Sequence, residues 1–357
     1  MSNFDIKDAI RTVVEGESLT TDSASAVMDQ IMTGAVTPAQ LGALITALRM
    51  KGETIDEIAG FAGAMRRHAL HVDVDHEDGP LVDTCGTGGD ASGTFNISTT
   101  ASFAIAGAGV RVAKHGNRSI TSRCGSADLL EGLGVEIELT PSSVATCIDE
   151  VGIGFMFAPA FHPAMRFVGP TRREIGVRTV FNILGPLTNP AGAKNQLIGV
   201  GHRGISEKLA GALALLGSQR VVLVHAEEGL DELGLSGPSH VTEYDARRDS
   251  ISTYTLSPTD VGLSIAPQGA LAGGELAENM AITREILAGA TGPRRDATLL
   301  NAGAGIYAAG AAESIQEGVS KAKDAIDTGR AMDRLERLAM RSRELKNAEM
   351  ADLAVQA

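Results

Sequence analysis

The feature that most constrains this fold is a change of pattern near residue 72. Before that point the sequence predicts helices only. Thr37 with Gln40, and Thr54 with Glu57, form two capping boxes, which mark the starts of helices. We predict a small helical domain over residues 1–72. A helical layer of one larger domain would show nearly the same pattern.

From residue 73 onward, short apolar runs alternate with helical stretches. The strand candidates are residues 81–83, 110–113, 153–157, 197–200 and 220–224. The expected helices are residues 101–108, 141–151, 206–216 and one long charged helix from 311 to the end. Such alternation is typical of an α/β fold with a central, mostly parallel sheet. We therefore predict a larger α/β domain over residues 73–357.

The composition argues against several classes of partner. The formal net charge is −13 and 43% of the residues are hydrophobic, as in an acidic globular protein. Such a chain should be repelled by nucleic acid and by anionic membranes. The N-terminus lacks a signal-peptide pattern, and no apolar run reaches the roughly 18 residues of a membrane span. The cysteines Cys85, Cys124 and Cys147 match no zinc spacing. We expect a cytoplasmic protein.

Charge is unevenly distributed along the chain. Residues 91–127 contain no Asp or Glu, and in residues 151–206 Glu174 is the only acid. The basic residues there include Arg111, Lys114, Arg118, Arg123, Arg166, Arg172, Arg173, Arg178, Lys194 and Arg203. Chance and buried apolar helices could produce such gaps, but glycine-rich turns fall in the same segments. We therefore predict a pocket for a highly anionic small ligand.

Three motifs in these segments suit phosphate binding. Residues 83–90, Asp-Thr-Cys-Gly-Thr-Gly-Gly-Asp, lie between a strand candidate and a helix candidate, so backbone N–H groups there can converge on phosphate oxygens. Their spacing is neither that of a Walker A loop nor that of a Rossmann loop. Residues 96–99, Asn-Ile-Ser-Thr, can cap the next helix, bind phosphate or ligate a metal. Residues 114–128 are rich in hydrogen-bond donors.

Taken together, these motifs resemble the anthranilate phosphoribosyltransferases of tryptophan biosynthesis. The matching stretches are Cys-Gly-Thr-Gly-Gly-Asp at 85–90, Asn-Ile-Ser-Thr at 96–99, Lys-His-Gly-Asn-Arg-Ser at 114–119, residues 162–190, and Gly-Leu-Asp-Glu-Leu at 229–233. The resemblance extends from the N-terminal helices to at least residue 310. It implies a small helical domain beside an α/β domain, with a helical piece near residues 160–185 joined to the small domain. It also implies a homodimer formed through the helical parts.

The resemblance also implies the site residues. The donor, phosphoribosyl pyrophosphate, would be bound by Gly86, Gly89, Asp90, Thr94, Asn96, Ile97, Ser98, Thr99, Lys114, His115, Gly116, Asn117, Arg118, Ser119, Ile120, Thr121, Ser122 and Ser126. The cofactor would be Mg²⁺, held by Ser98, Asp231 and Glu232. Anthranilate would lie near Gly86 and Asn117, with its carboxylate on Arg172 or, failing that, Arg173. Thr171 departs slightly from the family, where the position before this arginine is commonly apolar.

Several alternatives stay open at this point. A pyrimidine-nucleoside phosphorylase shares the fold but uses free phosphate, so the Asp231–Glu232 pair favours the transferase. A non-catalytic relative that binds nucleic acid should carry a continuous basic surface, unlike this acidic chain. His115 is a candidate general base, although a structural role or a contact with the aromatic ring of anthranilate suits it at least as well. No amidotransferase segment is attached, and association with a separate anthranilate synthase chain is an open question.

Overall fold

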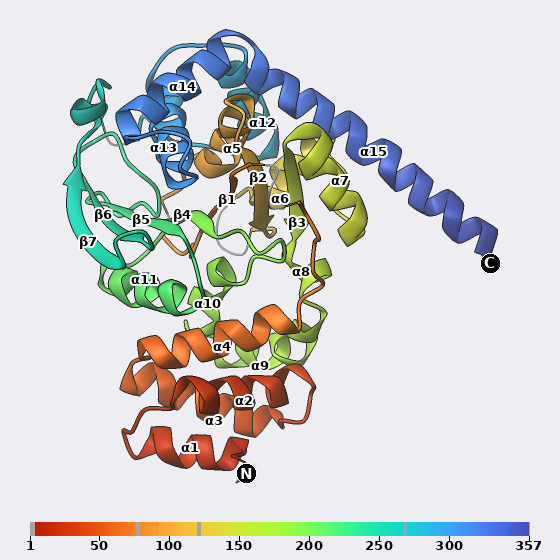
Figure 1. The fold of residues 1–357 in the computed structure, drawn as a ribbon, viewed down its shortest axis with the longest axis vertical. Helices are drawn as coiled ribbons and strands as arrows, with labels where there is room; N and C mark the ends of the chain where they lie inside the picture. The colour runs from red at the N-terminus through yellow and green to blue at the C-terminus, as the bar shows by residue number, and fades with distance from the viewer. Residues whose placement is uncertain (1–3, 76–78, 91, 120–122, 268, 357) are drawn as a thin grey trace.

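The computed structural model describes residues 4–75, 79–90, 92–119, 123–267 and 269–356, and shows a helical bundle beside a larger α/β body (Figure 1). The bundle contains α1 (Ile6–Val14), α2 (Thr21–Met32), α3 (Pro38–Lys51) and α4 (Ile55–Arg67). The strands are β1 (Leu81–Gly86), β2 (Arg111–Gly116), β3 (Ile153–Phe157), β4 (Asn195–Gly199), β5 (Arg220–Ala226), β6 (Ser239–Asp245) and β7 (Ser250–Leu256). The other α-helices are α5 (Ile97–Gly107), α6 (Ser126–Gly132), α7 (Pro141–Val151), α8 (Ala158–Phe161), α9 (Gly169–Ile175), α10 (Phe181–Leu184), α11 (Ser206–Leu215), α12 (Leu276–Leu287), α13 (Pro293–Ala308), α14 (Ile315–Asp327) and α15 (Arg330–Gln356). None of the helices in the described part of the chain combines the length and the apolar character that crossing a membrane requires.

Both predicted capping boxes open helices of the bundle. The Thr37 hydroxyl accepts the Gln40 N–H at 3.3 Å, and the Gln40 side chain accepts the Thr37 N–H at 3.0 Å. Thr54 and Glu57 make the same exchange at 3.3 and 2.9 Å. Each box satisfies backbone donors that the first turn of a helix leaves unpaired. The sequence prediction of helix starts in this region is confirmed.

A central sheet of seven strands, counted within the described residues, has the order β3-β2-β1-β4-β5-β6-β7. The five neighbouring strands β3, β2, β1, β4 and β5 pair in parallel, whereas the β5–β6 and β6–β7 pairs are antiparallel. All five strand candidates are confirmed, with limits that differ by a few residues. The β6–β7 hairpin is missing from the sequence prediction. Most of β7 is exposed as an edge strand, so it lacks the apolar run that reveals a buried strand.

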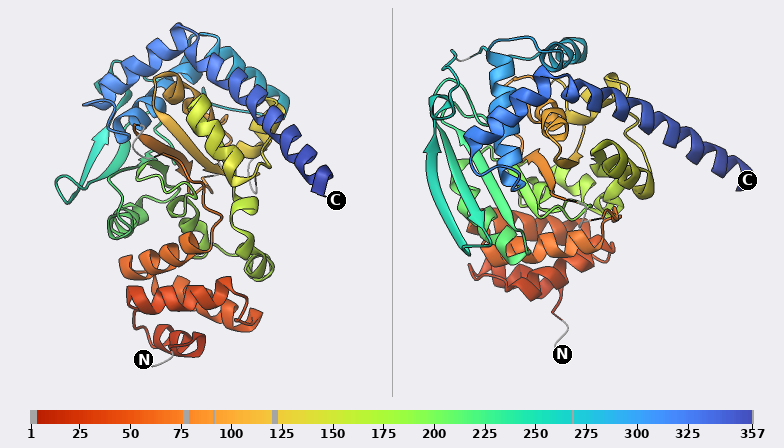
Figure 2. Two further views of the ribbon diagram at one scale, coloured as in Figure 1. Left: turned by 45° about the vertical axis from the view of Figure 1, so that its right-hand side comes forward. Right: turned by 45° about the horizontal axis from the view of Figure 1, so that its top comes forward.

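Two apolar cores lie on opposite faces of this sheet. Side chains alternate across a strand, so Leu197 of β4 packs with α5, α13 and α14, while Ile198 packs with α11 and the helical bundle. Val222 and Leu223 of β5 divide between the cores in the same way. Figure 2 shows the blue C-terminal helices on one side of the sheet and the red and orange bundle on the other.

The segment near residues 160–185 returns to the bundle. α9 packs against α3, and the Cδ1 atom of Ile175 lies 3.6 Å from where a Cβ atom of residue 42 would stand. Val168, Val180 and Phe181 enter the apolar core of the bundle. This piece therefore packs with helices that precede it by more than a hundred residues. The domain limit at residue 72 stays a prediction.

The C-terminal tail differs from the single solvated helix that the sequence suggested. α14 and α15 are separated at Gly329, whose φ of +77° lies in the left-handed region that glycine adopts easily. α14 also buries Val319, Ala322 and Ile326 in the core. The charged residues of the tail masked this apolar stripe in the sequence. The end of α15 projects away from the body (Figures 1 and 2).

Candidate active site

The predicted glycine loop, residues 86–90, leaves the carboxyl end of β1 at the centre of the sheet. The chain places β2 on one side of β1 and β4 on the other, so the strand order reverses at this strand. In open α/β sheets, ligands bind outside the carboxyl ends of strands at such a switch point. The Thr87 N–H donates to the Gly199 carbonyl at 2.8 Å, and the Thr87 hydroxyl accepts the Gly201 N–H at 2.9 Å. The first turn of the loop is thereby fixed to the end of β4.

Asp231 reaches the glycine loop from the segment after β5. Its Oδ2 atom accepts the backbone N–H of Gly88 at 2.9 Å. A Cβ atom on residue 86 would stand 2.6 Å from the same oxygen, so Gly86 must lack a side chain for this contact to form. The structure thus joins two motifs that lie 143 residues apart in the chain.

Glu232 lies at the amino end of α5, where its Oε1 atom accepts the backbone N–H of Ser98 at 3.1 Å. The helix begins at Ile97, and the side chain of Asn96, at the N-cap position, makes no capping hydrogen bond. Instead the Asn96 amide donates to the Cys124 carbonyl at 3.0 Å. The sequence prediction that residues 96–99 cap their own helix is wrong in this respect. A distant carboxylate serves this end of the helix, where the helix dipole attracts negative charge.

The environment of the two carboxylates disfavours their charged forms. Burial, followed by repulsion from Asp90, raises the pKa of Asp231 to about 7. Burial and then repulsion from Asp231 raise the pKa of Glu232 to about 8. Both side chains are half-buried against the strand ends. A divalent cation beside them would relieve this repulsion and favour the ionised state.

The donor set around these carboxylates suits Mg²⁺. Carboxylate and hydroxyl oxygens are the hard ligands that this ion prefers, and Ser98 adds a hydroxyl that hydrogen-bonds Glu232. Across the described residues, no three His, Cys, Asp or Glu side chains cluster closely enough to hold a metal by themselves. Mg²⁺ commonly takes only one or two protein carboxylates and completes its shell with water and substrate phosphates. The residues present therefore fit a magnesium ion that binds together with a phosphorylated ligand.

Asn301 of α13 holds the segment that carries the two carboxylates. Its side-chain oxygen accepts the Leu233 N–H at 3.0 Å, and its side-chain nitrogen donates to the Leu233 carbonyl at 3.0 Å. The side chain is fully buried. Asn301 therefore pairs with both backbone polar groups of Leu233, as a neighbouring strand would. This fixes the residue next to Glu232. Sequence reasoning missed this residue, because it lies in a helix and belongs to no recognisable motif.

Gly199 allows the same segment to approach the sheet. A Cβ atom on residue 199 would stand 1.6 Å from the backbone oxygen of Asp231, a distance that no rearrangement of side chains can relieve. The strand end and the carboxylate segment are therefore in direct backbone contact.

Gly199→Ala is expected to displace Asp231 and Glu232 and to cost about 1–3 kcal/mol of folding free energy, as overpacking in a core does. Magnesium-supported binding of pyrophosphate should weaken at least about tenfold, measured by isothermal calorimetry. Gly204→Ala is the matched control, because a Cβ atom there meets nothing within 4 Å. Equal affinities in the two variants would show that the close contact does not position the carboxylates.

Lys114 lies beneath the site rather than at its surface. Its side chain is buried, and the ammonium group donates to the Thr84 carbonyl at 2.7 Å. Burial lowers the pKa of Lys114, while the nearby Asp83, Cys85 and Glu232 act in the opposite direction. This buried cation compensates part of the negative charge of Glu232.

The second predicted donor segment, residues 114–126, is less cationic than its sequence suggests. The guanidinium of Arg118 donates to Asp128 at 2.9 Å and to Glu131 at 2.8 Å, both on α6. Arg111 likewise pairs with Asp149 at 3.2 Å. Acids outside the acid-free segment therefore pair with these two arginines and reduce the positive charge that the sequence pattern suggested.

The remaining members of this segment lie close to the ends of β2 and α6. Ser126 donates through its hydroxyl to the Asn117 carbonyl at 3.1 Å, and its Oγ atom lies 2.4 Å from where a Cβ atom of residue 116 would be. The Ser119 N–H donates to Asp128 at 3.2 Å. A side chain at residue 116 would therefore displace the Ser126 hydroxyl and press on the ring of Phe155. The predicted donor residues Ile120, Thr121 and Ser122 lie outside the described residues.

Two buried histidines form a pair beside the end of β2. The rings of His115 and His162 have centroids 5.0 Å apart, and the Nε2 atoms of both are buried without a hydrogen-bond partner. Burial and then the neighbouring His162 lower the pKa of His115 to about 3, and burial lowers the pKa of His162 to about 4. Both rings are therefore neutral near pH 7. An imidazole with so low a pKa is a weak base, which favours a structural or contact role for His115 over general base catalysis.

Three arginines that follow β3, namely Arg172, Arg173 and Arg178, have different surroundings. Arg172 is half-buried on α9, with its guanidinium 5.6 Å from the ring centre of Phe181, and burial lowers its pKa. Arg173 is exposed. Arg178 extends to the glycine loop, where it donates to the Gly88 carbonyl at 3.0 Å. Sequence reasoning counted Arg178 among the basic residues but assigned it no role.

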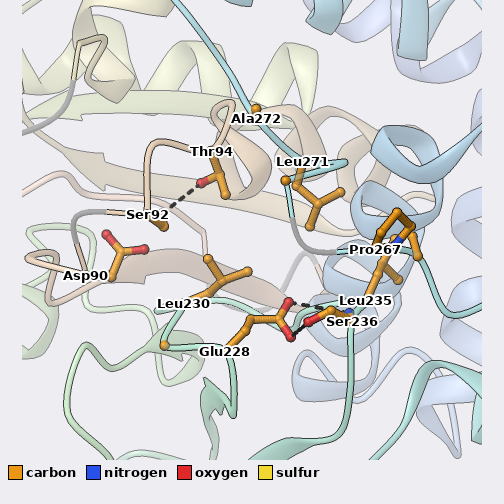
Figure 3. Close-up of a pocket in the computed structure, with 13 residues that line it drawn as sticks. Asp90, Ser92, Thr94, Glu228, Leu230, Leu235, Ser236, Pro267, Leu271 and Ala272 are labelled. Carbon is orange, nitrogen blue, oxygen red and sulfur yellow. Dashed lines mark hydrogen bonds between the residues drawn. The ribbon is translucent and has the colours of Figure 1, made fainter.

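A small cavity lies behind the glycine loop, with Asp90, Ser92 and Thr94 on one side and Glu228 and Ser236 on the other (Figure 3). The Thr94 and Ser92 hydroxyls are 3.3 Å apart, and the Ser236 hydroxyl donates to Glu228. Its volume of about 150 Å³ is below the ~300–1,000 Å³ of typical ligand pockets. The cavity is therefore smaller than a typical ligand pocket, although Asp90 and Thr94 of the predicted donor set line it.

Comparisons with known proteins show the family of this chain. Residues 78–332 match the glycosyl transferase family a/b domain, and residues 7–69 match the helical bundle domain of that family. An anthranilate phosphoribosyltransferase of Herpetosiphon aurantiacus is 56% identical over 335 residues, which are 93% of this chain and 98% of that protein. Another from Moorella thermoacetica is 53% identical over 331 residues, 93% of this chain and 96% of that protein.

Solved structures similar to this chain are also anthranilate phosphoribosyltransferases. The anthranilate phosphoribosyltransferase of Thermus thermophilus has a TM-score of 0.88 and 47% identity, covering 94% of this chain and 99% of that chain. The enzyme of Saccharomyces cerevisiae in complex with PRPP and Mg has a TM-score of 0.85 and 27% identity, covering 95% and 98%. The same yeast enzyme has been solved with 4-fluoroanthranilate, with a TM-score of 0.79, 28% identity, and coverage of 91% and 92%. This chain belongs to the anthranilate phosphoribosyltransferase family.

Proposed function

We propose that this protein transfers the 5-phosphoribosyl group of phosphoribosyl pyrophosphate to the amine of anthranilate and releases pyrophosphate, as a step of L-tryptophan biosynthesis. The observation that carries the proposal is the meeting of the glycine loop, the amino end of α5 and the Asp231–Glu232 pair at the switch point of the sheet. Backbone N–H groups there suit phosphate oxygens, and the carboxylates suit a cation that accompanies them.

We propose that Mg²⁺ is the cofactor and that Ser98, Asp231 and Glu232 hold it. The hard oxygen donors and the raised pKa values of both carboxylates support this assignment. When bound, the ion would neutralise negative charge on the pyrophosphate group as it leaves. The yeast relative solved with PRPP and Mg supports the same cofactor.

The chain's own groups would then bind and orient the donor. N–H groups of the glycine loop and of the amino end of α5 would hold phosphate oxygens, while Lys114 would compensate buried negative charge. We propose the same residues for binding phosphoribosyl pyrophosphate as the sequence analysis does. Arg118 would contribute chiefly by fixing its segment, because Asp128 and Glu131 engage its guanidinium. The aromatic amine would attack in its neutral form, so no general base is required.

For the acceptor, we propose that Arg172 binds the anthranilate carboxylate, near Gly86 and Asn117. The half-buried guanidinium stacked on Phe181 is better shielded from water than that of Arg173, and shielding strengthens its pairing with a carboxylate. A relative that binds 4-fluoroanthranilate supports a site for this class of acceptor.

Arg172→Ala is therefore expected to raise the KM for anthranilate about 10- to 100-fold while the KM for the donor changes less than about threefold. Steady-state kinetics with each substrate varied in turn would measure both constants. Arg173→Ala is the comparison variant and should change neither constant by more than about threefold. A larger anthranilate effect from Arg173→Ala would assign the carboxylate to that residue instead.

The proposed activity is tested by turnover with anthranilate, phosphoribosyl pyrophosphate and Mg²⁺. Formation of the phosphoribosyl product and of pyrophosphate is the expected result. Rapid phosphorolysis of uridine or thymidine, without reaction of anthranilate, would instead identify a pyrimidine-nucleoside phosphorylase. Tight binding of DNA at physiological salt, without either reaction, would identify a nucleic-acid-binding relative.

We further propose that two copies associate through the helical bundle and that the protein works in the cytoplasm. Apolar side chains exposed on and near the bundle support association there, with Met50 84% and Val14 67% exposed. Light scattering coupled to size-exclusion chromatography would give the mass of the assembly. A monomer at micromolar concentration would contradict the dimer.

A further inference from the structure

Arg178 contacts the glycine loop through the oxygens of two successive peptide units. Its Nη2 atom donates to the Gly88 carbonyl at 3.0 Å and makes a longer contact of 3.5 Å with the Thr87 carbonyl. Its Nη1 atom lies 1.6 Å from where a Cβ atom of residue 89 would stand. The guanidinium therefore lies directly on the loop, at a place that only glycine leaves open.

These contacts determine the direction of the loop's N–H groups. The described residues contain no cis peptide bond, and in a planar trans peptide the C=O and N–H groups point in opposite directions. The peptide between Thr87 and Gly88 follows this rule, because its oxygen faces Arg178 while its N–H donates to Asp231. The Gly88 oxygen also faces Arg178, so the N–H of Gly89 points away from the arginine.

Asp231 fixes the N–H of Gly88, but the peptide between Gly88 and Gly89 is held through its oxygen by Arg178 and would otherwise have little reason to keep one orientation. Gly88 and Gly89 have φ values of +64° and +84°, and glycine also adopts many other backbone conformations at low cost. A rotated peptide would present a carbonyl oxygen where an N–H group is needed, and the oxygen would repel a phosphate. In the present structure the carboxylate of Asp231 accepts the Gly88 N–H, as an anion bound to the loop would.

We propose that Arg178 is a positioning residue for the phosphoribosyl donor: it holds the Thr87 and Gly88 carbonyls on one side of the glycine loop, so that the N–H of Gly88 faces Asp231 and the N–H of Gly89 faces the bound phosphates. The inference rests on the proposed function of this site and assigns a role to an arginine beyond the predicted binding residues. Arg178 follows α9 and so belongs to the segment that carries the acceptor residue Arg172. It thereby connects the acceptor segment to the donor loop.

The test uses the full-length protein with Mg²⁺ and inorganic pyrophosphate, titrated by isothermal calorimetry. Arg178→Ala is expected to weaken pyrophosphate binding about 10- to 100-fold. The KM for the phosphoribosyl donor should rise by a similar factor, while the KM for anthranilate at saturating donor changes less than about threefold. Arg178→Lys should recover part of the loss, because an ammonium group can still donate to carbonyl oxygens. Arg248→Ala, an exposed arginine at the other end of the sheet, is the control for loss of one positive charge.

Salt dependence separates positioning from direct contact with the phosphates. An arginine that touched pyrophosphate would account for part of the salt sensitivity, so its removal would flatten the dependence of affinity on ionic strength. We expect Arg178→Ala and wild-type protein to show the same slope between about 50 and 200 mM salt. Unchanged affinity, a flatter slope, or a loss confined to anthranilate would each overturn the role of Arg178. Failure of the wild-type protein itself to bind pyrophosphate would overturn the proposed function as well.

Discussion

Replacing Glu232 with glutamine should raise the magnesium concentration for half-maximal turnover by about 100-fold, because it removes a formal negative charge from the proposed ion site. The glutamine carbonyl can still accept the Ser98 N–H, so the amino end of α5 stays capped. Asp231→Asn should act in the same direction. Magnesium titrations of initial rate at saturating substrates would measure the shift.

A second measurement makes the magnesium prediction sharper. At about pH 9, above the pKa values of both groups, the carboxylates are charged without Mg²⁺ and should repel pyrophosphate from the glycine loop. Glu232→Gln should therefore bind Mg²⁺-free pyrophosphate more tightly than wild-type protein does at that pH. Opposite changes with and without the ion would distinguish a metal ligand from a residue that only supports the fold. Glu227→Gln is the control, since Glu227 is exposed in the same segment. Unaltered magnesium curves in both site variants would contradict the metal assignment.

The second large effect concerns the stability of the protein in acid. His115 and His162 have pKa values of about 3 and about 4 in the folded protein, against a usual value of 6.5. A histidine with a depressed folded pKa takes up a proton more readily in the unfolded chain, so stability falls as pH falls below 6.5. The two residues together should contribute a slope of about 3 kcal/mol per pH unit between pH 6.5 and about 4.

Asp231 and Glu232 act in the opposite sense over part of this range. Their folded pKa values are raised to about 7 and about 8, so the folded state holds protons that the unfolded state has lost, and stability rises as pH falls towards about 4.5. In the absence of metal, these carboxylates therefore offset part of the histidine contribution to the wild-type profile. The histidine contribution is best seen as a difference between two proteins that share the carboxylates.

The double variant His115→Asn/His162→Asn isolates that contribution. The free energy of unfolding, measured by urea denaturation without metal, should be lower for the variant near pH 7 because of lost packing. The difference between the proteins should then change in favour of the variant by about 3 kcal/mol for each pH unit between 6.5 and about 4. His71→Asn, which alters an exposed histidine, should leave the wild-type profile in place. A constant difference across the pH range would show that the buried rings are not held neutral.

Local sequence patterns were sufficient for much of the fold. The boxes at Thr37 and Thr54 give helix starts because the partner residues are only three positions away and need no tertiary contact. The buried parallel strands are visible because both of their faces are covered, which produces continuous apolar runs. β7 escaped notice because an exposed edge strand lacks such a run. The break at Gly329 was hidden by the charged residues on both sides of it.

The sequence by itself determined the parts of the site that each lie in one stretch of chain: the glycine loop, the Asp231–Glu232 pair and the resemblance to a family that combines them. Tertiary structure decided how these parts are connected. Only the folded chain shows that Glu232 accepts an N–H at the amino end of α5, that Asn301 holds Leu233, and that Arg178 donates to the Gly88 carbonyl of the glycine loop. It also shows that Asp128 and Glu131 neutralise Arg118. The physical reason is that hydrogen bonds and charges act over a few ångströms of space, and separation along the chain does not reveal which groups come that close.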